Sequence, residues 1–378
     1  MQLVAYGAQD VYLTGDPQIT YFKVVYRRHT NFSMECIQQT FNGTPGFNKK
    51  VSTTISRNGD LIGAMHIAMP DAAMVGGTGG AAAPTKIFSD YVDEVTVEIG
   101  GQQIDKHYGK WLDIWYDLST NLKNKPKDTL FTSPWYGTNT DPTGSGSTSA
   151  VTSVGGFGYS YIPLQFWFNR NAGLALPLIA LQYHEVKLTI KFATTEPTGS
   201  KRDLTKAQLW VDYFYLDTEE RKRFAQMSHE YLIDQLQFTG AESLSQGGDK
   251  YRLNFNHPVK ELVWETVPAG SSLNSTVKLQ LNGHDRFAER NFKYFSLLQK
   301  YYHHTNVPAG GSNNVGVYSF ALRPEEHQPS GTCNFSRIDN ATLVSGGANN
   351  GTGAIDIYAV NYNVLRVVSG MGGLAYSN

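Results

Sequence analysis

Residues 95–118 read VTVEIGGQQIDKHYGKWLDIWYDL, and the chain carries a second version of this stretch. The second version, VKLQLNGHDRFAERNFKYFSLLQKY, begins at Val277 in the other half of the chain. Each version starts with alternating apolar and polar residues, the pattern of a strand with one buried face. A Gly-Gly pair at 100–101 and an Asn-Gly pair at 282–283 then suit the positive φ angles of a type I′ turn. Both stretches therefore predict a β-hairpin.

A helix is predicted after each hairpin. In both copies, apolar residues recur at i, i+3, i+4 and i+7, which places them on one face of a helix. They are Trp111, Ile114, Trp115 and Leu118 in the first copy, and Tyr294, Leu297, Leu298 and Tyr301 in the second. A strand–turn–strand–helix unit that recurs at this separation indicates two similar domains, and chance similarity of two hairpins is the alternative interpretation.

Composition favours an all-β protein. Among 378 residues, 12% are aromatic, 37 are Gly and only 17% are charged, a balance typical of strands separated by many turns. The formal net charge of −1 argues against nucleic-acid binding, which usually brings a basic excess. The basic runs at 27–29 and 221–223 are interpreted as solvated charge.

Cysteine content and the terminal sequence indicate a reduced, cytosolic setting. Only Cys36 and Cys333 are present, too few for a disulfide framework, and we expect both to be buried as small hydrophobes. The N-terminal MQLVAYGAQD lacks the basic flank and apolar run of a secretory signal. No apolar run approaches the roughly 18–20 residues of a membrane span. We therefore expect a soluble protein made in the cytosol.

The chain divides into four predicted segments. Residues 1–24 form an N-terminal arm, in which Asp16 would cap a short helix over 17–24. A first β domain covers 25–216, a helical linker 217–231, and a second β domain 232–378. In the linker, Asp217 and Glu220 suit a capping box, and Phe224, Met227 and Tyr231 would form the apolar stripe.

Short strands between turn residues are predicted throughout both domains. In the first domain they lie at 33–41, 50–56, 61–69, 95–99, 185–192 and 208–216, with a further strand and a Pro-initiated turn after Phe166. In the second they lie at 232–239, 251–255, 259–265, 277–281, 316–320, 332–335, 339–344 and 355–368. Stretches 76–83 and 129–158 are predicted to be loops because small and polar residues dominate them.

Four long motifs resemble one family. They read LVAYGAQDVYLTGDPQITYFKVVYRRHTNF (3–32), FWFNRNAGLALPLIALQYHEVKLTIKF (166–192), QPSGTCNFSRIDNA (328–341) and YAVNYNVLRVVSGMGGLAYSN (358–378). In these motifs the chain is similar to the major capsid proteins of large double-stranded DNA viruses that infect algae and amoebae. The motifs lie at both ends and in both halves, so the resemblance covers the whole chain.

The resemblance implies an architecture and a set of partners. Each subunit would contain two consecutive eight-stranded antiparallel jelly rolls, with short helices in the inter-strand connections. Three subunits would form a pseudo-hexameric homotrimer, and such capsomers would tile an icosahedral shell over an internal lipid membrane that the chain does not span. Expected partners are neighbouring capsomers and the minor capsid and penton proteins, with no direct nucleic-acid contact. Expected locations are the virion capsid and, for synthesis and assembly, the host cytoplasm.

No catalytic, cofactor or metal site is predicted. His303 and His304, with His284 nearby in sequence, lack a Cys or carboxylate at a recognisable ligand spacing, so we expect surface or interface histidines. The acidic pair Glu325-Glu326 could split its pKa values for acid–base work, but no nucleophile accompanies it. The protein is therefore expected not to be an enzyme.

Six Asn-x-Ser/Thr sequons are present. Asn31, Asn42, Asn274 and Asn350 are retained as weak candidates for glycosylation, since ordinary glycosylation requires a secretory route. Asn334 and Asn340 belong to a family motif and are interpreted as structural.

Two other functions stay open. The nearer alternative is a minor or variant capsid paralogue. The more distant one is a tandem jelly-roll glycan-binding protein or glycan amidase, which would need acidic or aromatic residues clustered in a groove. If the chain is a capsid protein, we expect the arm at 3–24 to reach below the jelly rolls and contact neighbouring proteins. The arm has more apolar residues than a short isolated segment can bury by itself.

Overall fold

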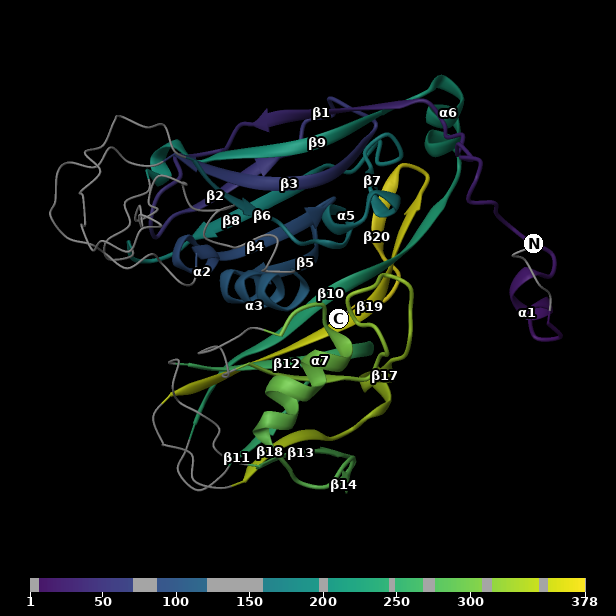
Figure 1. The fold of residues 1–378 in the computed structure, drawn as a ribbon. Coiled ribbons are helices and arrows are strands. Elements are labelled where there is room, and N and C mark those ends of the chain that lie inside the picture. The colour runs from purple at the N-terminus through teal and green to yellow at the C-terminus, as the bar shows by residue number, and fades with distance from the viewer. Residues whose placement is uncertain are drawn as a thin grey trace, which may run out of the picture.

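The computed structural model describes residues 7–70, 87–120, 159–196, 203–244, 249–267, 276–307, 315–346 and 353–377. Two β-sandwiches lie one beside the other, and the N-terminal arm extends away from both (Figure 1). Helix α6 (Thr218–Gln226) connects the last strand of the first sandwich to the first strand of the second. The loops predicted at 76–83 and 129–158 lie outside the described residues.

Two antiparallel sheets form the first sandwich. One has the order β1 (Phe32–Gln39), β9 (Gln208–Leu216), β3 (Leu61–Pro70) and β6 (Tyr159–Pro163), with β7 (Leu176–Pro177) pairing with β3. The other has the order β2 (Lys50–Thr54), β8 (Val186–Phe192), β4 (Val92–Ile99) and β5 (Gln102–Tyr108). The connections contain α2 (Ile87–Tyr91), α3 (Gly109–Ser119), α5 (Trp167–Arg170) and the 3₁₀ turns η2 (Ala172–Leu174) and η3 (Leu204–Lys206).

The second sandwich repeats this plan. Its first sheet has the order β10 (His229–Ser243), β19 (Ala354–Val368), β12 (Pro258–Val267) and β16 (Val315–Ser319); β17 (Cys333–Asn334) pairs with β12 and β20 (Met371–Leu374) with β19. Its second sheet has the order β11 (Asp249–Arg252), β18 (Ala341–Gly346), β13 (Thr276–Leu281) and β14 (His284–Asp285), with β15 (Arg290–Asn291) also on β13. The π-helix η4 (Tyr294–Leu298), α7 (Gln299–His303) and the 3₁₀ turn η5 (Phe335–Arg337) complete it.

The strand orders of the two sandwiches correspond position by position. Strand β1 corresponds to β10, β3 to β12, β6 to β16 and β9 to β19, and the second sheets correspond in the same way. Each sandwich is therefore an eight-stranded antiparallel jelly roll, and the double jelly-roll prediction is confirmed. The repeated turns also have the predicted geometry, because Gly100 and Gly101 have φ of 58° and 83°, and Asn282 and Gly283 have φ of 52° and 80°.

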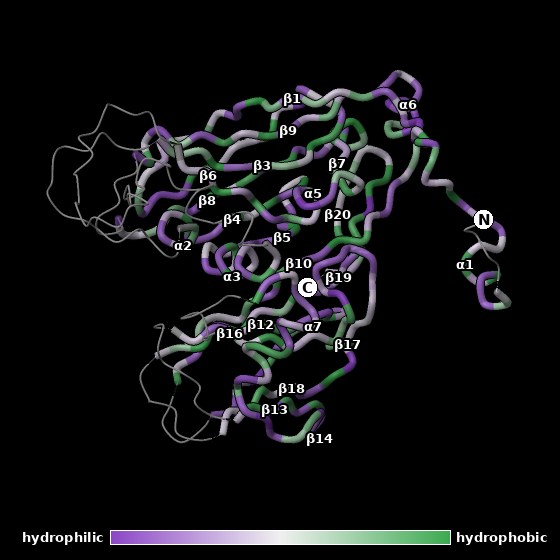
Figure 2. The backbone as a smooth tube through the Cα atoms, viewed as in Figure 1, coloured by the Kyte–Doolittle hydropathy of each residue, from purple (hydrophilic) through white to green (hydrophobic). Residues whose placement is uncertain are grey.

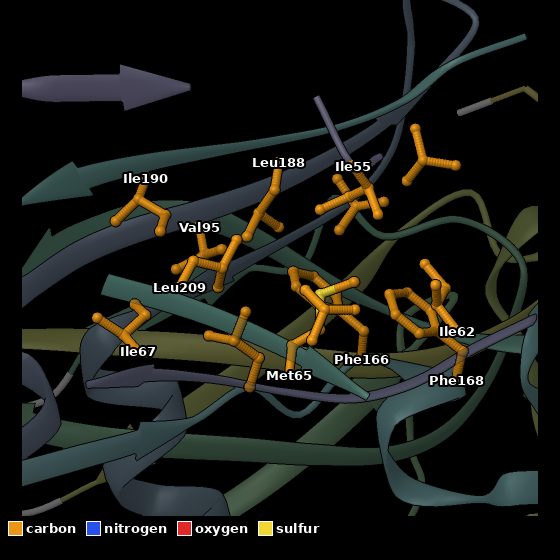
Figure 3. Packing of buried hydrophobic residues seen from close by; sticks show 14 of the residues in the cluster. Ile55, Ile62, Met65, Ile67, Val95, Phe166, Phe168, Leu188, Ile190 and Leu209 are labelled. Carbon is orange, nitrogen blue, oxygen red and sulfur yellow. The ribbon is translucent and has the colours of Figure 1, made fainter. Parts of the chain in front are cut away.

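Apolar and polar residues alternate along the strands, and the apolar residues form the cores. On β4, Val95, Val97 and Ile99 are buried while the residues between them are partly exposed. They meet inward residues of β3, β8 and β9, together with Phe166 and Phe168 from the α5 segment (Figure 3). Each such side chain contributes about 1.5–3 kcal/mol when it leaves water. By contrast, Figure 2 shows α6 as almost wholly hydrophilic, and none of its residues is buried.

The two cores are linked through the long strands of the second half. Ile233 on β10 and Leu365 and Val367 on β19 belong to the core cluster of the first sandwich. The β19–β20 hairpin also reaches that sandwich, where the backbone N–H of Tyr183 donates to the carbonyl oxygen of Gly370. No helix among the described residues is long and apolar enough to cross a membrane.

The helix predicted over 17–24 is wrong. The arm instead contains one turn of helix, α1 (Val11–Thr14), and Asp16 has a φ of 45°, which is not a capping conformation. Ile19 and Phe22 are 65% and 99% exposed. Because so short a helix is marginal in water without packing, the residues that follow Asp16 stay non-helical.

Two further local predictions need correction. The segment after Phe166 forms helix α5 and the turn η2 instead of a strand, and Pro177 lies in the two-residue strand β7. Asp217 does accept a hydrogen bond at the start of α6, from the N–H of Thr218, but the helix ends at Gln226. Tyr231 belongs to β10, because pairing with Leu365 on β19 extends that strand back toward the helix.

Candidate assembly interface

Helix α3 joins the two jelly rolls. Leu112 and Tyr116 point into the first core. The opposite face, predicted as the apolar stripe, packs on the outer surface of the second jelly roll. This contact comprises Trp111, Ile114, Trp115 and Leu118 from α3, Val263 from β12, Val317 from β16, and Tyr358 and Val360 from β19. The rings of Trp111 and Tyr358 are 5.4 Å apart. A helix that is apolar on two faces thus fixes one jelly roll against the other.

Local packing sets the position of α3. A Cβ on Gly109 would lie 1.9 Å from the carbonyl oxygen of Val92, so only glycine lets the helix begin this close to β4. The Asp113 carboxylate accepts hydrogen bonds from the backbone N–H groups of Phe88 and Ser89 at 3.3 and 2.9 Å. These bonds satisfy two N–H groups at the start of α2 and tie the two helices together.

Charged side chains surround the apolar contact. Lys110 Nζ lies 2.6 Å from Asp356 Oδ2 across the seam. Asp234 accepts from Arg170 at 2.8 Å and pairs with the fully buried Lys260 at 3.1 Å, while the Arg170 guanidinium lies 4.8 Å from the Trp115 ring centroid. Burial lowers the pKa of Lys260, although Asp234 opposes the shift. One carboxylate therefore neutralises cations from both jelly rolls. Removing it would take the shared partner from the fully buried Lys260 and the largely buried Arg170.

Backbone hydrogen bonds complete the seam. The N–H of Leu236 on β10 donates to Asp105 Oδ1 at 3.1 Å, and the Gln235 side chain donates to the carbonyl oxygen of Ile104. At the other end of α3, Asn306 donates through its side chain to Asp117 O at 2.7 Å and through its backbone to Leu118 O at 3.0 Å. The last carbonyls of a helix need partners, and here the second jelly roll supplies them.

The His304 side chain is fully buried between β12 and Glu325, so the prediction of a surface histidine is wrong for this residue. Its Nε2 lies 3.2 Å from Glu261, and its Nδ1 lies 2.9 Å from Glu325. Burial alone lowers the pKa of His304, but the two carboxylates outweigh it and raise the pKa to about 9. Because the carboxylates sit on opposite ring nitrogens, they hold an imidazolium and do not converge on a common metal position.

The histidines and carboxylates of the described part of the chain do not gather into a metal site. There, no group of three or more His, Cys, Asp or Glu side chains has the geometry to hold a metal ion. His303 contacts the carbonyl oxygen of Leu322 through Nδ1, and His284 lies in the exposed strand β14. Glu325 forms an ion pair with the buried His304.

The second copy of the apolar stripe is not buried as the first is. Leu297 and Leu298 are 39% and 40% exposed, and Tyr301 is 71% exposed. On the buried side, Phe295 packs into the second core, and Lys300 is buried close to Asp117 of α3 and Glu265 of β12. The two helix copies therefore share an orientation, but the outer face is covered only in the first.

The remaining candidate residues occupy varied positions. Asn31 and Asn42 are exposed, whereas Asn274 and Asn350 lie outside the described residues. The Asn334 side chain accepts from the N–H of Ser336 in the turn η5. Both cysteines are free, and the prediction of a buried Cys36 is wrong, because it lies exposed on β1; Cys333 is partly buried against the second core.

Sequence reasoning missed the Arg170–Asp234–Lys260 cluster and the Glu261–His304 pair. A signal was present, because β12 reads PVKELVWETV and places Lys260, Glu261 and Glu265 within an apolar strand. Charges in a strand that is otherwise buried indicate ion pairs, since unpaired buried charges are too costly. Their partners come from distant elements and required the fold.

Two jelly rolls fixed through a packed helix face define a structural, double jelly-roll protein. Sequence profiles agree: residues 20–217 match the major capsid protein N-terminus, and 220–272 and 268–373 match the large eukaryotic DNA virus major capsid protein. The chain belongs to this family of viral major capsid proteins.

Individual relatives are similar over their full length. The chain is 51% identical to the major capsid protein of Pyramimonas orientalis virus and 44% identical to that of Paramecium bursaria Chlorella virus 1, covering 100% of this chain and 99% of each relative. Among solved structures, a subunit of the PBCV-1 virus capsid superimposes with a TM-score of 0.78 at 40% identity, over 95% of this chain and 100% of that one. The Faustovirus major capsid protein shares the fold, with a TM-score of 0.68 at 12% identity.

Proposed function

We propose that this chain builds a viral shell by self-assembly, as a homotrimeric, pseudo-hexameric capsomer of an icosahedral capsid. The observation that carries this proposal is the repeat itself: two jelly rolls with corresponding strand orders lie beside each other in one chain. Three such chains supply six similar sandwiches, so a threefold particle can occupy a hexagonal lattice position. Closed cyclic symmetry is the usual way in which identical chains satisfy their interfaces.

Contacts between capsomers are assigned to the N-terminal arm. Seven of its large apolar side chains are exposed among the described residues: Val11, Tyr12, Leu13, Ile19, Tyr21, Phe22 and Val24. Val25 and Tyr26, which follow the arm, are exposed as well. An exposed apolar concentration of this kind is characteristic of a binding surface. The arm would bind neighbouring capsomers, or minor capsid and penton proteins, below the jelly rolls. The shell would lie over an internal lipid membrane.

The proposal extends to organisation and location. The chain would divide into an arm (1–24), a first jelly roll (25–216), a linker that the structure shortens to 217–228, and a second jelly roll that begins with β10 at His229. Synthesis and assembly would take place in the host cytoplasm, and the protein would act without catalysis and without direct nucleic-acid contact. Glycan attachment at Asn31, Asn42, Asn274 or Asn350 stays a prediction.

Sedimentation equilibrium of the purified full chain, combined with a glycan-binding assay, tests this function. A tight trimer without saccharide affinity is the expected result, whereas a stable monomer that binds saccharides would support a glycan-binding protein instead. Copy number in purified virions separates a major from a minor capsid role: the major protein should be the most abundant shell component.

A further inference from the structure

The second jelly roll presents an uncovered copy of the helix face that joins the two halves. In the first half, Trp115 and its neighbours on α3 rest on the outer surface of the β10-β19-β12-β16 sheet. Leu297, Leu298 and Tyr301 occupy the equivalent positions of the second copy and are 39%, 40% and 71% exposed. The same chain therefore has one covered and one open version of a single contact.

The first jelly roll presents an uncovered copy of the receiving surface. In the covered contact, Val263 on β12 pairs with Tyr358 on β19 and Val317 on β16. On the corresponding strand β3, His66 pairs with Trp210 on β9 and Pro163 on β6. Both Val263 and His66 lie between residues that point into their own cores, so each faces outward.

The open sheet surface has the chemistry of a docking site. Tyr161 packs edge-on against His66 at 5.6 Å, and Trp210 is only partly buried. Further along β1, Met34 and Phe32 are 57% and 48% exposed. Aromatic and Met side chains of this kind are enriched at the centres of protein interfaces.

A lysine flanks each copy of the helix face. Lys110 precedes Trp111 and pairs with Asp356, which lies opposite Glu265 in the sheet. Lys293 precedes Tyr294 in the same way. On the open sheet the position of Asp356 is taken by Gln208, which lies opposite Ala68. An amide oxygen there can still accept a hydrogen bond from a lysine, as a weaker partner than a carboxylate.

We propose that the face formed by Leu297, Leu298 and Tyr301 docks on the outer surface around His66 and Trp210 of a second copy of this chain. The proposal rests on the trimeric function above and specifies the surface that forms the trimer. The contact is head-to-tail, so it either closes into a ring or grows into a filament. Closure at three chains gives six contacts of one kind, three within chains and three between them.

Association of full-length variants tests the proposal. Leu298→Glu places a charge in the proposed contact, and Leu13→Glu makes the same change at an exposed leucine of the arm. We expect Leu298→Glu to raise, at least tenfold, the chain concentration at which half of the chains are trimeric. We expect Leu13→Glu to leave this concentration unchanged. Circular dichroism melting checks that both variants fold. A folded Leu298→Glu chain that trimerises like the wild type would overturn the proposal.

A photo-cross-linker locates the contact. With a benzophenone amino acid at Tyr301 and a mixture of isotopically light and heavy chains, mass spectrometry should find light–heavy links to peptides of β3 or β9. Links confined to one chain or to other elements would contradict the proposal while leaving the trimer intact. A wild-type chain that stays monomeric at every concentration would instead overturn the trimeric function, and this contact with it.

Discussion

At the scale of single residues, His304 shows how a buried charge is held by ion pairs in the second half of the chain. Its pKa of about 9 in the folded chain lies above the ordinary value of 6.5, so the imidazolium stabilises the fold fully below pH 6.5 and loses that effect as the pH rises to 9. Its partner Glu325 has a lowered pKa and stabilises the fold above its ordinary value of 4.5. Lys300 acts in the opposite sense, because burial lowers its pKa to about 8 and stability rises as it deprotonates.

Comparing a His304 variant with the wild type separates the pH dependence of stability due to His304 from that due to Lys300, because both chains keep Lys300. The loss of unfolding free energy in His304→Gln, relative to the wild type, should be larger at pH 6 than at pH 9.5 by on the order of 3 kcal/mol. Urea unfolding at both pH values measures this difference. His303→Gln serves as the control because the His303 ring contacts the Leu322 carbonyl oxygen and the Tyr302 ring. An equal loss at both pH values would show that His304 is not charged in the fold.

Gly109 offers a second test at this scale. Gly109→Ala should lower the unfolding free energy by about 3 kcal/mol, because the new methyl group would overlap the Val92 carbonyl. Gly101→Ala is the control: its Cβ meets open space, and only its positive φ of 83° adds a cost of about 1–2 kcal/mol. Thermal unfolding of both variants shows which one is destabilised more. Equal destabilisation would contradict the close approach of Gly109 to the Val92 carbonyl.

At the scale of elements, local chemistry determined what the sequence could predict. The two hairpins were predictable because Gly100-Gly101 and Asn282-Gly283 specify their turns without help from the rest of the chain. The helix predicted over 17–24 failed because capping residues do not replace burial. The stripe along η4 and α7 was recognised as apolar, but periodicity identifies an apolar face and not the surface that covers it. The Asp234 cluster depended on three distant elements and was invisible locally.

Equivalent positions on the two helix copies should therefore respond differently to truncation. Trp115→Ala should lower the unfolding free energy of the chain by about 3–5 kcal/mol, because it empties the seam between the jelly rolls. Leu298→Ala should change it by less than about 1 kcal/mol when the chain is dilute and unassembled. Denaturant unfolding at low protein concentration compares the two, and a large loss for Leu298→Ala would mean that its face is covered within the chain.

At the scale of the whole molecule, the arm and the jelly rolls divide the work of assembly. Deleting residues 1–24 should leave trimers intact and prevent shells, because the exposed apolar side chains of the arm contact neither jelly-roll core. Sedimentation of the truncated chain reports the trimer, and electron microscopy of assembly mixtures with the other capsid proteins reports the shell. If the truncated chain formed normal shells, the arm would not be required for contacts between capsomers.

The fold explains why a repeated jelly roll suits this role. The two copies have diverged on their outer faces, with Trp115 matched by Leu298 and Val263 by His66. The first pair of faces meets within one chain and must stay together permanently, whereas the second meets only on assembly. A smaller, more polar contact between chains allows the monomer to remain folded before it assembles.

Cryo-electron microscopy of the purified wild-type particle tests the central claim most directly. The account predicts three chains, six sandwich-shaped lobes in a hexagonal outline, and the Leu297–Leu298–Tyr301 face of each chain resting on β3 and β9 of the next. A particle with another number of chains, or one in which that face points to solvent, would contradict it.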